Sequence, residues 1–441
     1  MITNMDANRF ATHSLKNPRI LRILSAALQA VDPAEAVRKH IPKVNGNVYG
    51  LAIGKASIPM LTALAEALSL SNALAISKHA SSLTSNLFPV ILGSHPIPDA
   101  KSLHAGQRVM ELVSSLKEDE TLICLISGGG SALVTAPYEG ITLEDMQSLT
   151  SLLLSCGARI DEINTLRRQL DRIKGGGLSR ATKAKVISLI LSDVIGNPLE
   201  AIASGPTCPN PTTNADALAI LKKYHIEEKA PDAILNHLHN VTLSEAKSLN
   251  RNENETLRSL RSFKVTSPTV ENIIIGDNRF AAQAALEQAG REGFSAEILT
   301  NELQGEAREV GVMLAKQLRE EITKRPRPFC LIAGGETTVT IQGNGKGGRN
   351  QELALAAVDE LAGEQDVVLI ALATDGEDGP TDAAGAVVTG DSAWMAERLG
   401  VDAADHLSRN DAYAFFDALG DLIRTGPTGT NVNDLIFLVA I

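Results

Sequence analysis

The sequence predicts an α/β protein of two domains, each a mainly parallel or mixed sheet flanked by helices. Short apolar runs alternate with helical patterns along the chain, which is typical of parallel strands buried on both faces. The 441 residues, with 44% hydrophobic content, exceed what a single core normally organises. A polar, charged stretch at 241–268 separates two such regions. It is the expected linker between an N-terminal domain, 1–240, and a C-terminal domain, 269–441.

The expected elements follow from this alternation. In the first region a helical pattern at 58–68 lies between apolar runs. The strands expected there are 48–53, 74–77, 89–92, 122–126 and 186–192. The second region has helical patterns at 307–324 and 351–361. The strands expected there are 273–275, 296–299, 330–333, 338–341, 367–372 and 435–439. Because ligands bind at the carboxyl ends of parallel strands, the residues after each strand are the first candidates for a site.

Composition argues against two classes of partner. The chain has 41 basic and 52 acidic residues, a net charge of −11 and 3% aromatic residues, so a nucleic-acid partner is not expected. No apolar run is long enough to cross a membrane, and residues 1–16 are polar without a signal-peptide core. None of the four cysteines has a partner at zinc-ligand spacing, and buried thiols fit a reducing compartment. We expect a cytoplasmic protein with a small-molecule substrate, and homo-oligomer formation is left open.

A Ser/Gly loop after the strand at 122–126 is the strongest local signal for anion binding. It reads Ser127-Gly128-Gly129-Gly130-Ser131. Three glycines are costly in chain entropy, but they let backbone N–H groups converge on an anion. A tight strand-to-helix turn would explain the same residues without a ligand. The loop would also suit a phosphosugar-binding module, so it does not by itself specify an enzyme.

Lys55 follows the strand at 48–53 in a near match to a phosphate-binding loop. The glycine spacing is one residue short, and Ala56 stands where Ser or Thr would bind magnesium. A strand, Gly54-Lys55 and a helix start remain, and this order presents an ammonium group at the carboxyl edge of a sheet. The alternative is a solvated lysine on a turn.

Asp193 ends the apolar strand at 186–192, where a substrate would lie. Its carboxylate could coordinate magnesium or accept a proton from a substrate hydroxyl. It could equally cap a helix that starts near Pro198. The local sequence leaves both readings open.

A basic glycine-rich loop follows the expected strand at 338–341. Gly343, Gly345 and Gly348 form a G-x-G-x-x-G pattern, but Lys346 and Arg349 crowd it, and the next strand-terminal acid is too distant for an NAD site. Arginine suits the charge of a transferring phosphoryl group, so a phosphoryl clamp is the better reading. Its expected binding residues are Gly345, Lys346, Gly347, Gly348 and Asn350.

Other polar residues near strand ends are weaker candidates. Glu336 and Asp375 are candidate magnesium ligands together with Asp193, although an acidic turn with solvated charges would also explain Asp375. His95 is a candidate for the substrate pocket. Lys174, before three glycines, belongs to a second basic, flexible loop for a phosphate or a lid.

Taken together, these motifs resemble those of the bacterial glycerate 2-kinases. The motifs that match the N-terminal part of that family are Ile53-Gly54-Lys55-Ala56, Ser127-Gly128-Gly129-Gly130-Ser131-Ala132, Leu191-Ser192-Asp193-Val194 and Ala203-Ser204-Gly205-Pro206-Thr207. Those that resemble its C-terminal "rich leucine" (MOFRL) domain are Gly335-Glu336-Thr337-Thr338, Gly347-Gly348-Arg349-Asn350-Gln351-Glu352, Ala373-Thr374-Asp375-Gly376 and Gly426-Pro427-Thr428-Gly429-Thr430-Asn431. The match runs from about Lys16 to the C-terminus, with the motifs in the same order.

The resemblance implies ATP-dependent phosphorylation of the 2-hydroxyl of D-glycerate with Mg²⁺, giving 2-phosphoglycerate and ADP. It implies a Rossmann-like N-terminal domain, a smaller MOFRL-type α/β domain and an active site in the cleft between them. Lys55 and Arg349 fall on the family's leading catalytic positions, and Asp193 would orient or deprotonate the hydroxyl. The metal ligands are left open.

Two other functions remain as alternatives at this stage. Members of this family have often been labelled hydroxypyruvate reductases, so an NAD(P)H-dependent reductase is the first. A non-catalytic phosphosugar-binding regulator is the second, although the chain has no recognisable DNA-binding module.

Overall fold

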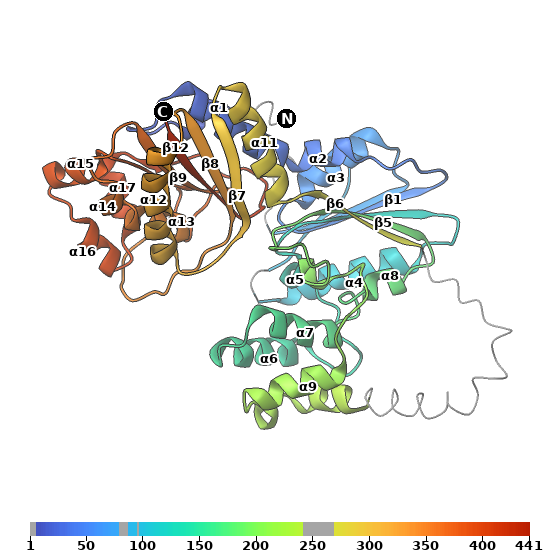
Figure 1. Cartoon of the computed structure of the whole chain (residues 1–441). Coiled ribbons are helices and arrows are strands. Elements are labelled where there is room, and N and C mark those ends of the chain that lie inside the picture. The colour runs from blue at the N-terminus through green and yellow to red at the C-terminus, as the bar shows by residue number, and fades with distance from the viewer. Residues whose placement is uncertain (1–5, 79–86, 95–96, 241–268) are drawn as a thin grey trace. The chain divides into compact units, whose positions relative to one another are not determined.

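The computed structural model describes residues 6–78, 87–94, 97–240 and 269–441 (Figure 1). The described residues form two compact units. Unit 1 comprises the residues up to Ala36, Leu191–Gly196 and Gly276–Ile441, and unit 2 comprises Val37–Ile190 and Asn197–Ile275. His95 and the expected linker 241–268 lie outside the described residues.

The sheet of unit 2 contains six strands within the described residues, in the order β3-β2-β1-β4-β5-β6. The strands are β1 (Val48–Ile53), β2 (Asn72–Ser77), β3 (Val90–Leu92), β4 (Thr121–Ile126), β5 (Lys185–Leu191) and β6 (Val270–Gly276). Strands β1 to β5 pair in parallel, and β1 lies between β2 and β4. The carboxyl ends of β1 and β4 therefore lie side by side at one edge, where the sequence placed its two phosphate-binding candidates.

Helices cover both faces of this sheet, with α3 and α4 on opposite sides (Figure 1). The helices of unit 2 are α3 (Ser57–Ala67), α4 (Ala100–Ser114), α5 (Gly130–Leu133), α6 (Leu143–Ser155), α7 (Ile160–Leu170), α8 (Gly177–Arg180) and α9 (Asn214–Lys223). The 3₁₀ turn η2 spans Ile202–Ser204. Helices α6, α7 and α9 and the helical residues 232–240 share a separate apolar cluster that includes Leu149, Leu166 and Leu221.

The sheet of unit 1 is mixed and also contains six strands within the described residues, in the order β11-β10-β9-β12-β8-β7. The strands are β7 (Ser295–Leu303), β8 (Phe329–Gly335), β9 (Val367–Ala373), β10 (Gly385–Thr389), β11 (Leu422–Ile423) and β12 (Asp434–Ala440). β7 and β8 are parallel, whereas β12 runs antiparallel to both β8 and β9. The start of β12 therefore lies beside the carboxyl ends of β8 and β9.

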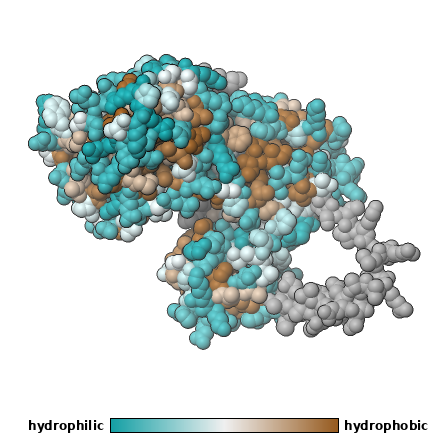
Figure 2. Space-filling model, in the orientation of Figure 1, coloured by the Kyte–Doolittle hydropathy of each residue, from teal (hydrophilic) through white to brown (hydrophobic). Residues whose placement is uncertain are grey.

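The helices of unit 1 bury both faces of this central sheet. They are α1 (Pro18–Ala30), α11 (Asn278–Arg291), α12 (Ala307–Lys324), α13 (Arg349–Ala356), α14 (Val358–Leu361), α15 (Ser392–Leu399), α16 (Ala403–Ser408) and α17 (Ala412–Leu419). Alternate residues of β8 and β12, such as Leu331 and Leu438, belong to one core with Phe415 and Phe416 of α17. Their neighbours Ile332 and Val439, on the other face, are also buried. Figure 2 shows hydrophilic residues over much of the visible surface of α12 to α17.

The N-terminal residues belong to unit 1, a division that differs from the expected boundary at 240. Helix α1 packs against α11. Asp421, which is buried, accepts hydrogen bonds from the hydroxyls of Thr12 and Ser14, both at 2.8 Å. Helix α2 (Pro33–Lys39) then leads into unit 2. The physical reason is that α1 is amphipathic and buries its apolar side, including Ile20 and Leu24, against a chain segment far away in the sequence.

Most expected strands are confirmed, and one is wrong. Residues 338–341 form no strand; Thr338 makes an isolated bridge to Glu306, and Thr340 N–H donates to the Glu306 carboxylate at 2.9 Å. The sequence analysis missed β10 and β11, which are short. Cys124 and Cys330 are buried and unpaired as expected, and burial raises the pKa of both thiols to about 12. Within the described ranges, no helix is both long enough and apolar enough to span a membrane.

Candidate active site

In unit 2, the loops that follow β1 and β4 are joined by three hydrogen bonds. Lys55 N–H donates to the carbonyl of Gly128 at 2.9 Å, and Ser127 N–H donates to the carbonyl of Ile53 at 3.0 Å. Ala56 N–H donates to the Ser127 hydroxyl at 3.0 Å. The structure therefore brings together the first two candidate motifs, and it gives Ser127 a positioning role because its side chain is buried between them.

The glycine-rich loop presents backbone donors that the described residues do not satisfy. No acceptor for the N–H groups of Gly128, Gly129 or Gly130 is found among the hydrogen bonds of the described chain. Gly129 has a φ of +82°, a conformation that side chains disfavour. The Lys55 side chain is exposed beside this loop. Convergent N–H groups next to an ammonium group can bind a phosphate or a carboxylate.

Behind this loop lies a strained turn. Ala203 and Ser204, which are not glycines, have φ values of 50° and 59°, and Gly205 follows with 62°. The hydroxyls of Ser204 and Ser131 contact each other, and Ser204 Oγ donates to Asn164 Oδ1 at 3.1 Å. Backbone strain of this kind persists where the surroundings impose it, and it clusters at ligand-binding sites.

Lys174 was expected in a flexible loop that binds a phosphate or forms a lid. The structure corrects this expectation, because the Lys174 side chain is buried. Its side chain is 3% exposed, and the ammonium group pairs with Asp171 at 2.5 Å and donates to the carbonyl of Val134 at 3.0 Å. Burial alone would raise the pKa of Asp171, but the charge and hydrogen bonds of Lys174 and the donors Ile173 and Thr135 outweigh it and lower that pKa. Lys174 is a buried structural cation.

In unit 1, the candidate residue Arg349 is held between two carboxylates. It is the first residue of α13, and its Nε and Nη2 donate to the two oxygens of Asp434 at 2.5 and 3.0 Å. Its Nη1 lies 2.8 Å from Glu336. Burial opposes the charge of the guanidinium group, but Asp434 and Glu336 outweigh it and raise the Arg349 pKa. The guanidinium plane is therefore fixed before any ligand arrives.

Asp378 fixes the helix that carries Arg349. Its carboxylate accepts from the backbone N–H groups of Asn350 at 3.1 Å and Gln351 at 2.8 Å, and it is 2% exposed. Burial, reinforced by the nearby Asp434 carboxylate, raises the pKa of Asp378 to about 7. The candidate Asn350 also donates its side-chain amide to Asp378 at 3.2 Å. Asn350 is therefore buried as a supporting residue.

The G-x-G-x-x-G loop uses several of its donors within the protein. Gly345 N–H donates to the carbonyl of Arg409 at 2.9 Å, and Lys346 N–H donates to Asp411 at 3.0 Å. The Lys346 ammonium lies 4.0 Å from the ring centroid of Tyr413. The backbone N–H groups of Gly345 and Lys346 are therefore already bonded to acceptors of the same unit, and phosphate binding by the Lys346 side chain stays a prediction. The backbone N–H groups of Gly347 and Gly348 have no hydrogen-bond acceptor among the described residues.

The three expected metal ligands do not form one cluster. No group of three or more His, Cys, Asp or Glu side chains with the geometry of a metal site exists in the described part of the chain. The carboxylate of Glu336 pairs with Arg349. Asp193 accepts from the side-chain amide of Asn431 at 3.3 Å, and Asp375 accepts from Glu377 N–H at 3.1 Å. In the described chain, Asp193, Glu336 and Asp375 therefore do not form one three-residue ligand set, and their roles as separate ligands stay predictions.

Sequence reasoning missed two groups of residues. Asp434 precedes an expected strand, and only the antiparallel direction of β12 places it beside Gly335 and Ala373. Asn164 lies on α7, where a polar residue of a helix gives no separate signal. Ser204 lies in a motif that the resemblance had marked, Ala203–Thr207, and this could have identified it.

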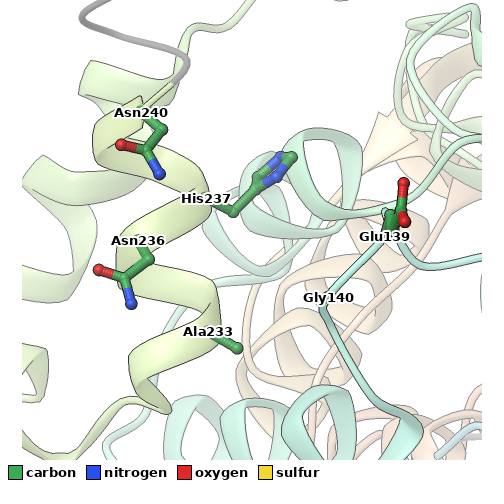
Figure 3. A pocket seen from close by; sticks show the side chains of 6 residues that line it. All are labelled: Glu139, Gly140, Ala233, Asn236, His237 and Asn240. Carbon is green, nitrogen blue, oxygen red and sulfur yellow. The ribbon is translucent and has the colours of Figure 1, made fainter.

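A surface hollow of about 520 Å³ contains none of the candidate residues (Figure 3). It is lined by Glu139 and Gly140 and by residues of the helical segment 232–240, namely Ala233, Asn236, His237 and Asn240. The His237 ring contacts the carbonyl of Gln169 at 3.1 Å and stacks on Tyr138 at 4.8 Å. The described residues that line this hollow include no lysine or arginine.

Comparisons with known proteins match two families to separate parts of the chain. A family described as a domain of unknown function, DUF4147, matches residues 19–239, and the MOFRL family matches residues 329–434. The sequence is 42% identical to the D-glycerate 2-kinase of Thermotoga maritima, covering 97% of this chain and 99% of the relative. It is 39% identical to the glycerate 2-kinase of Pyrococcus horikoshii, covering 95% and 96%. A crystal structure of glycerate kinase from T. maritima has a TM-score of 0.85 at 40% identity, covering 95% of this chain and 98% of that chain.

Proposed function

The chain belongs to the glycerate 2-kinase family, and on that premise we propose that it transfers a phosphoryl group from ATP to the 2-hydroxyl of D-glycerate. The observation that carries this proposal is identity of about 40% over nearly the full length of both chains, with both family domains present. The products are 2-phosphoglycerate and ADP. Four free cysteines, of which Cys124, Cys208 and Cys330 are buried, support a cytoplasmic location.

Lys55 and the glycine-rich loop are the proposed anion-binding groups of unit 2. The N–H groups of Gly128, Gly129 and Gly130 have no acceptor among the described residues, and Lys55 is exposed beside them. Both ATP and D-glycerate carry negative charge, while the chain as a whole is negative. Local positive charge and aligned N–H groups must therefore provide the attraction.

Arg349 is the proposed charge-stabilising residue of unit 1. Asp434 and Glu336 fix its guanidinium plane, so it needs little rearrangement when negative charge develops on a transferring phosphoryl group. The two carboxylates also reduce the net charge around the arginine. A phosphoryl group that displaces Glu336 would find the Arg349 guanidinium, whose side chain is 32% exposed, still oriented by Asp434.

Mg²⁺ is the proposed metal cofactor. This ion commonly binds through one or two carboxylates and the phosphates of a nucleotide, so it does not require a cage of three protein ligands. The donor chemistry fits at the 426–431 loop, where Asn431 bonds to the Asp193 carboxylate and Thr428 N–H donates to the Asp375 carbonyl at 3.1 Å. Asp193 and Asp375 would hold the ion, which neutralises phosphate charge when bound.

Asp193 is also the proposed hydroxyl-orienting residue. It follows β5 directly, and the amide of Asn431 fixes one of its oxygens. A carboxylate in this position can accept the hydrogen of the 2-hydroxyl as the oxygen attacks phosphorus.

An NAD(P)H-dependent reductase is not favoured. The glycines of the G-x-G-x-x-G pattern at 343–348 do not follow a strand, because residues 338–341 do not form one. A dinucleotide site needs that strand, with the pyrophosphate lying at the start of the following helix. In this chain the corresponding helix, α13, begins instead with the paired Arg349.

The proposal is tested by assaying the purified protein with ATP, Mg²⁺ and D-glycerate and measuring ADP release. An enolase-coupled step then distinguishes 2-phosphoglycerate from 3-phosphoglycerate, because enolase dehydrates only the 2-phosphate. Hydroxypyruvate with NADH serves as the control reaction. NADH oxidation without ADP release would overturn the kinase assignment in favour of the reductase.

A further inference from the structure

Arg167 on α7 has unused donors. Among the described residues it makes no ion pair, and its hydrogen bond, from Nη1 to Asn164 Oδ1, is long at 3.5 Å. The adjacent Arg168 provides the contrast. Its Nε donates to Asn210 at 3.0 Å, its Nη1 to the carbonyl of Glu200 at 3.1 Å, and its Nη2 to Thr165 at 3.0 Å. Arg168 is a structural residue, whereas Arg167 retains donors for a ligand.

A chain of contacts within unit 2 leads from Arg167 to the glycine-rich loop. Asn164 Oδ1 accepts from both Arg167 and Ser204. The Ser204 hydroxyl in turn contacts that of Ser131, which ends the loop. A Cβ on Gly130 would lie 2.9 Å from that of Ala203, so the loop and the strained turn are packed closely. The Arg167 side chain is therefore linked through Asn164 and Ser204 to Ser131, the residue that ends the glycine-rich loop.

The charges around Arg167 leave one positive charge unbalanced. Arg167 interacts electrostatically with Asp171 and Lys174, and these two residues form the buried ion pair described above. Burial lowers the pKa of Arg167, and Asp171 offsets this only in part. A partly buried arginine beside a neutral pair is stabilised by one further negative charge, which matches a carboxylate better than a triphosphate.

We propose that Arg167, together with Asn164 and the N–H groups of Gly128–Gly130, binds the carboxylate of a small hydroxy acid, the phosphoryl acceptor. This assignment rests on the proposed function and identifies the substrate group that unit 2 recognises. The planar guanidinium group matches a carboxylate in shape and can donate two parallel hydrogen bonds. Arg167 would then select acidic acceptors over neutral polyols, because loss of the carboxylate leaves the arginine unpaired.

The test compares Arg167→Ala with Arg172→Ala, a matched control on an exposed arginine of the following loop. KM for D-glycerate should rise about 30-fold or more in the Arg167 variant, as for the truncation of one member of a desolvated charge pair. KM for ATP should stay within about twofold, and Arg167→Lys should recover part of the loss. The Arg172 variant should resemble the wild type in both constants.

Calorimetric titration with D-glycerate in the absence of ATP separates this inference from the proposed function. Binding by the wild type and its loss in Arg167→Ala would support a carboxylate site even if no phosphoryl transfer occurred. A variant that melts normally but shows a raised KM for ATP alone would assign Arg167 to a nucleotide phosphate and overturn the proposal. Unchanged glycerate binding in a folded variant would also overturn it.

Discussion

At the scale of single residues, the two leading catalytic candidates differ in how they are held. Lys55 is exposed, and its backbone is fixed through Gly128. Arg349 is fixed through its side chain by Asp434 and Glu336. The Lys55 ammonium is exposed on a fixed backbone, whereas the guanidinium of Arg349 is held by its partners and stabilises charge at one place.

The Lys55→Ala variant should lose about 100-fold or more in kcat/KM, as expected for the removal of a preorganised charged donor. The fold should persist, because the side chain is exposed and the hydrogen bond to Gly128 comes from the backbone. Steady-state kinetics and a melting curve are the measurements. Kinetics close to wild type would make Lys55 a solvated lysine on a turn.

Arg349→Lys should be nearly as damaging to kcat as Arg349→Ala. Lysine cannot make the two parallel bonds to Asp434 and at the same time reach Glu336. Both variants are compared at saturating ATP and D-glycerate. If Arg349→Lys keeps most of the wild-type activity, the residue supplies only a point charge, and the fixed orientation of the guanidinium plane is not needed for catalysis.

Asp193→Asn should retain nucleotide binding and melting temperature while turnover falls. Asparagine has nearly the same shape but cannot accept a proton as a carboxylate does or hold Mg²⁺ as tightly. ADP release with D-glycerate and nucleotide binding are measured on the same preparation. A strongly lowered melting temperature, with turnover restored at low temperature, would indicate that the Asn431 contact is mainly structural.

At the scale of elements, the turns around α7 and α8 depend on a buried ion pair. Asp171 accepts from the Thr135 hydroxyl at 2.8 Å and from Ala136 N–H at 3.1 Å, and Lys174 bonds to the carbonyl of Val134. These bonds connect the segment after the glycine-rich loop to the segment that supports Ser204, because Gly175 N–H donates to the Ser204 carbonyl at 2.9 Å. The pair therefore positions the strained turn.

Replacing Lys174 with Met should destabilise the protein by about 3–5 kcal/mol, because it leaves the Asp171 carboxylate buried without its counter-charge. Urea denaturation measures the loss, and the double variant Asp171→Asn with Lys174→Met should be less destabilised than Lys174→Met alone. A stable Lys174→Met protein with weaker substrate binding would instead return Lys174 to a ligand-binding role.

At the scale of the whole molecule, the sequence predicted the strands well because buried parallel strands are continuous apolar runs, as in β4 and β9. The sequence-based prediction was wrong or incomplete where contacts between distant parts of the chain determine the conformation of a segment or the burial of a residue. Thr338 and Thr340 bond to Gly305 and Glu306 and join no strand of the sheet, and the antiparallel β12 brings Asp434 beside the ends of β8 and β9. The burial of Lys174 likewise depends on a partner that no local pattern reveals.

The stability of the whole molecule should carry a pH signature from Asp378. Its pKa is raised from 3.8 to about 7 in the folded state, so between these values the folded protein holds a proton that the unfolded chain has released. The contribution of this group to the free energy of unfolding therefore decreases as the pH rises from about 4 to about 7 and is constant above that range. Asp378→Asn cannot titrate and should lack this component.

The measurement is urea denaturation of the wild type and Asp378→Asn from about pH 5 to about pH 8, a range that crosses the folded pKa. The wild-type free energy minus that of the variant should fall with rising pH and become level near pH 8. At pH 5 the variant should be the less stable protein, because an amide nitrogen, which cannot accept a hydrogen bond, replaces one of the two oxygens that face the N–H groups of Asn350 and Gln351. A pH-independent difference would mean that Asp378 keeps an ordinary pKa, and the hydrogen bonds at the start of α13 would then outweigh burial and the charge of Asp434.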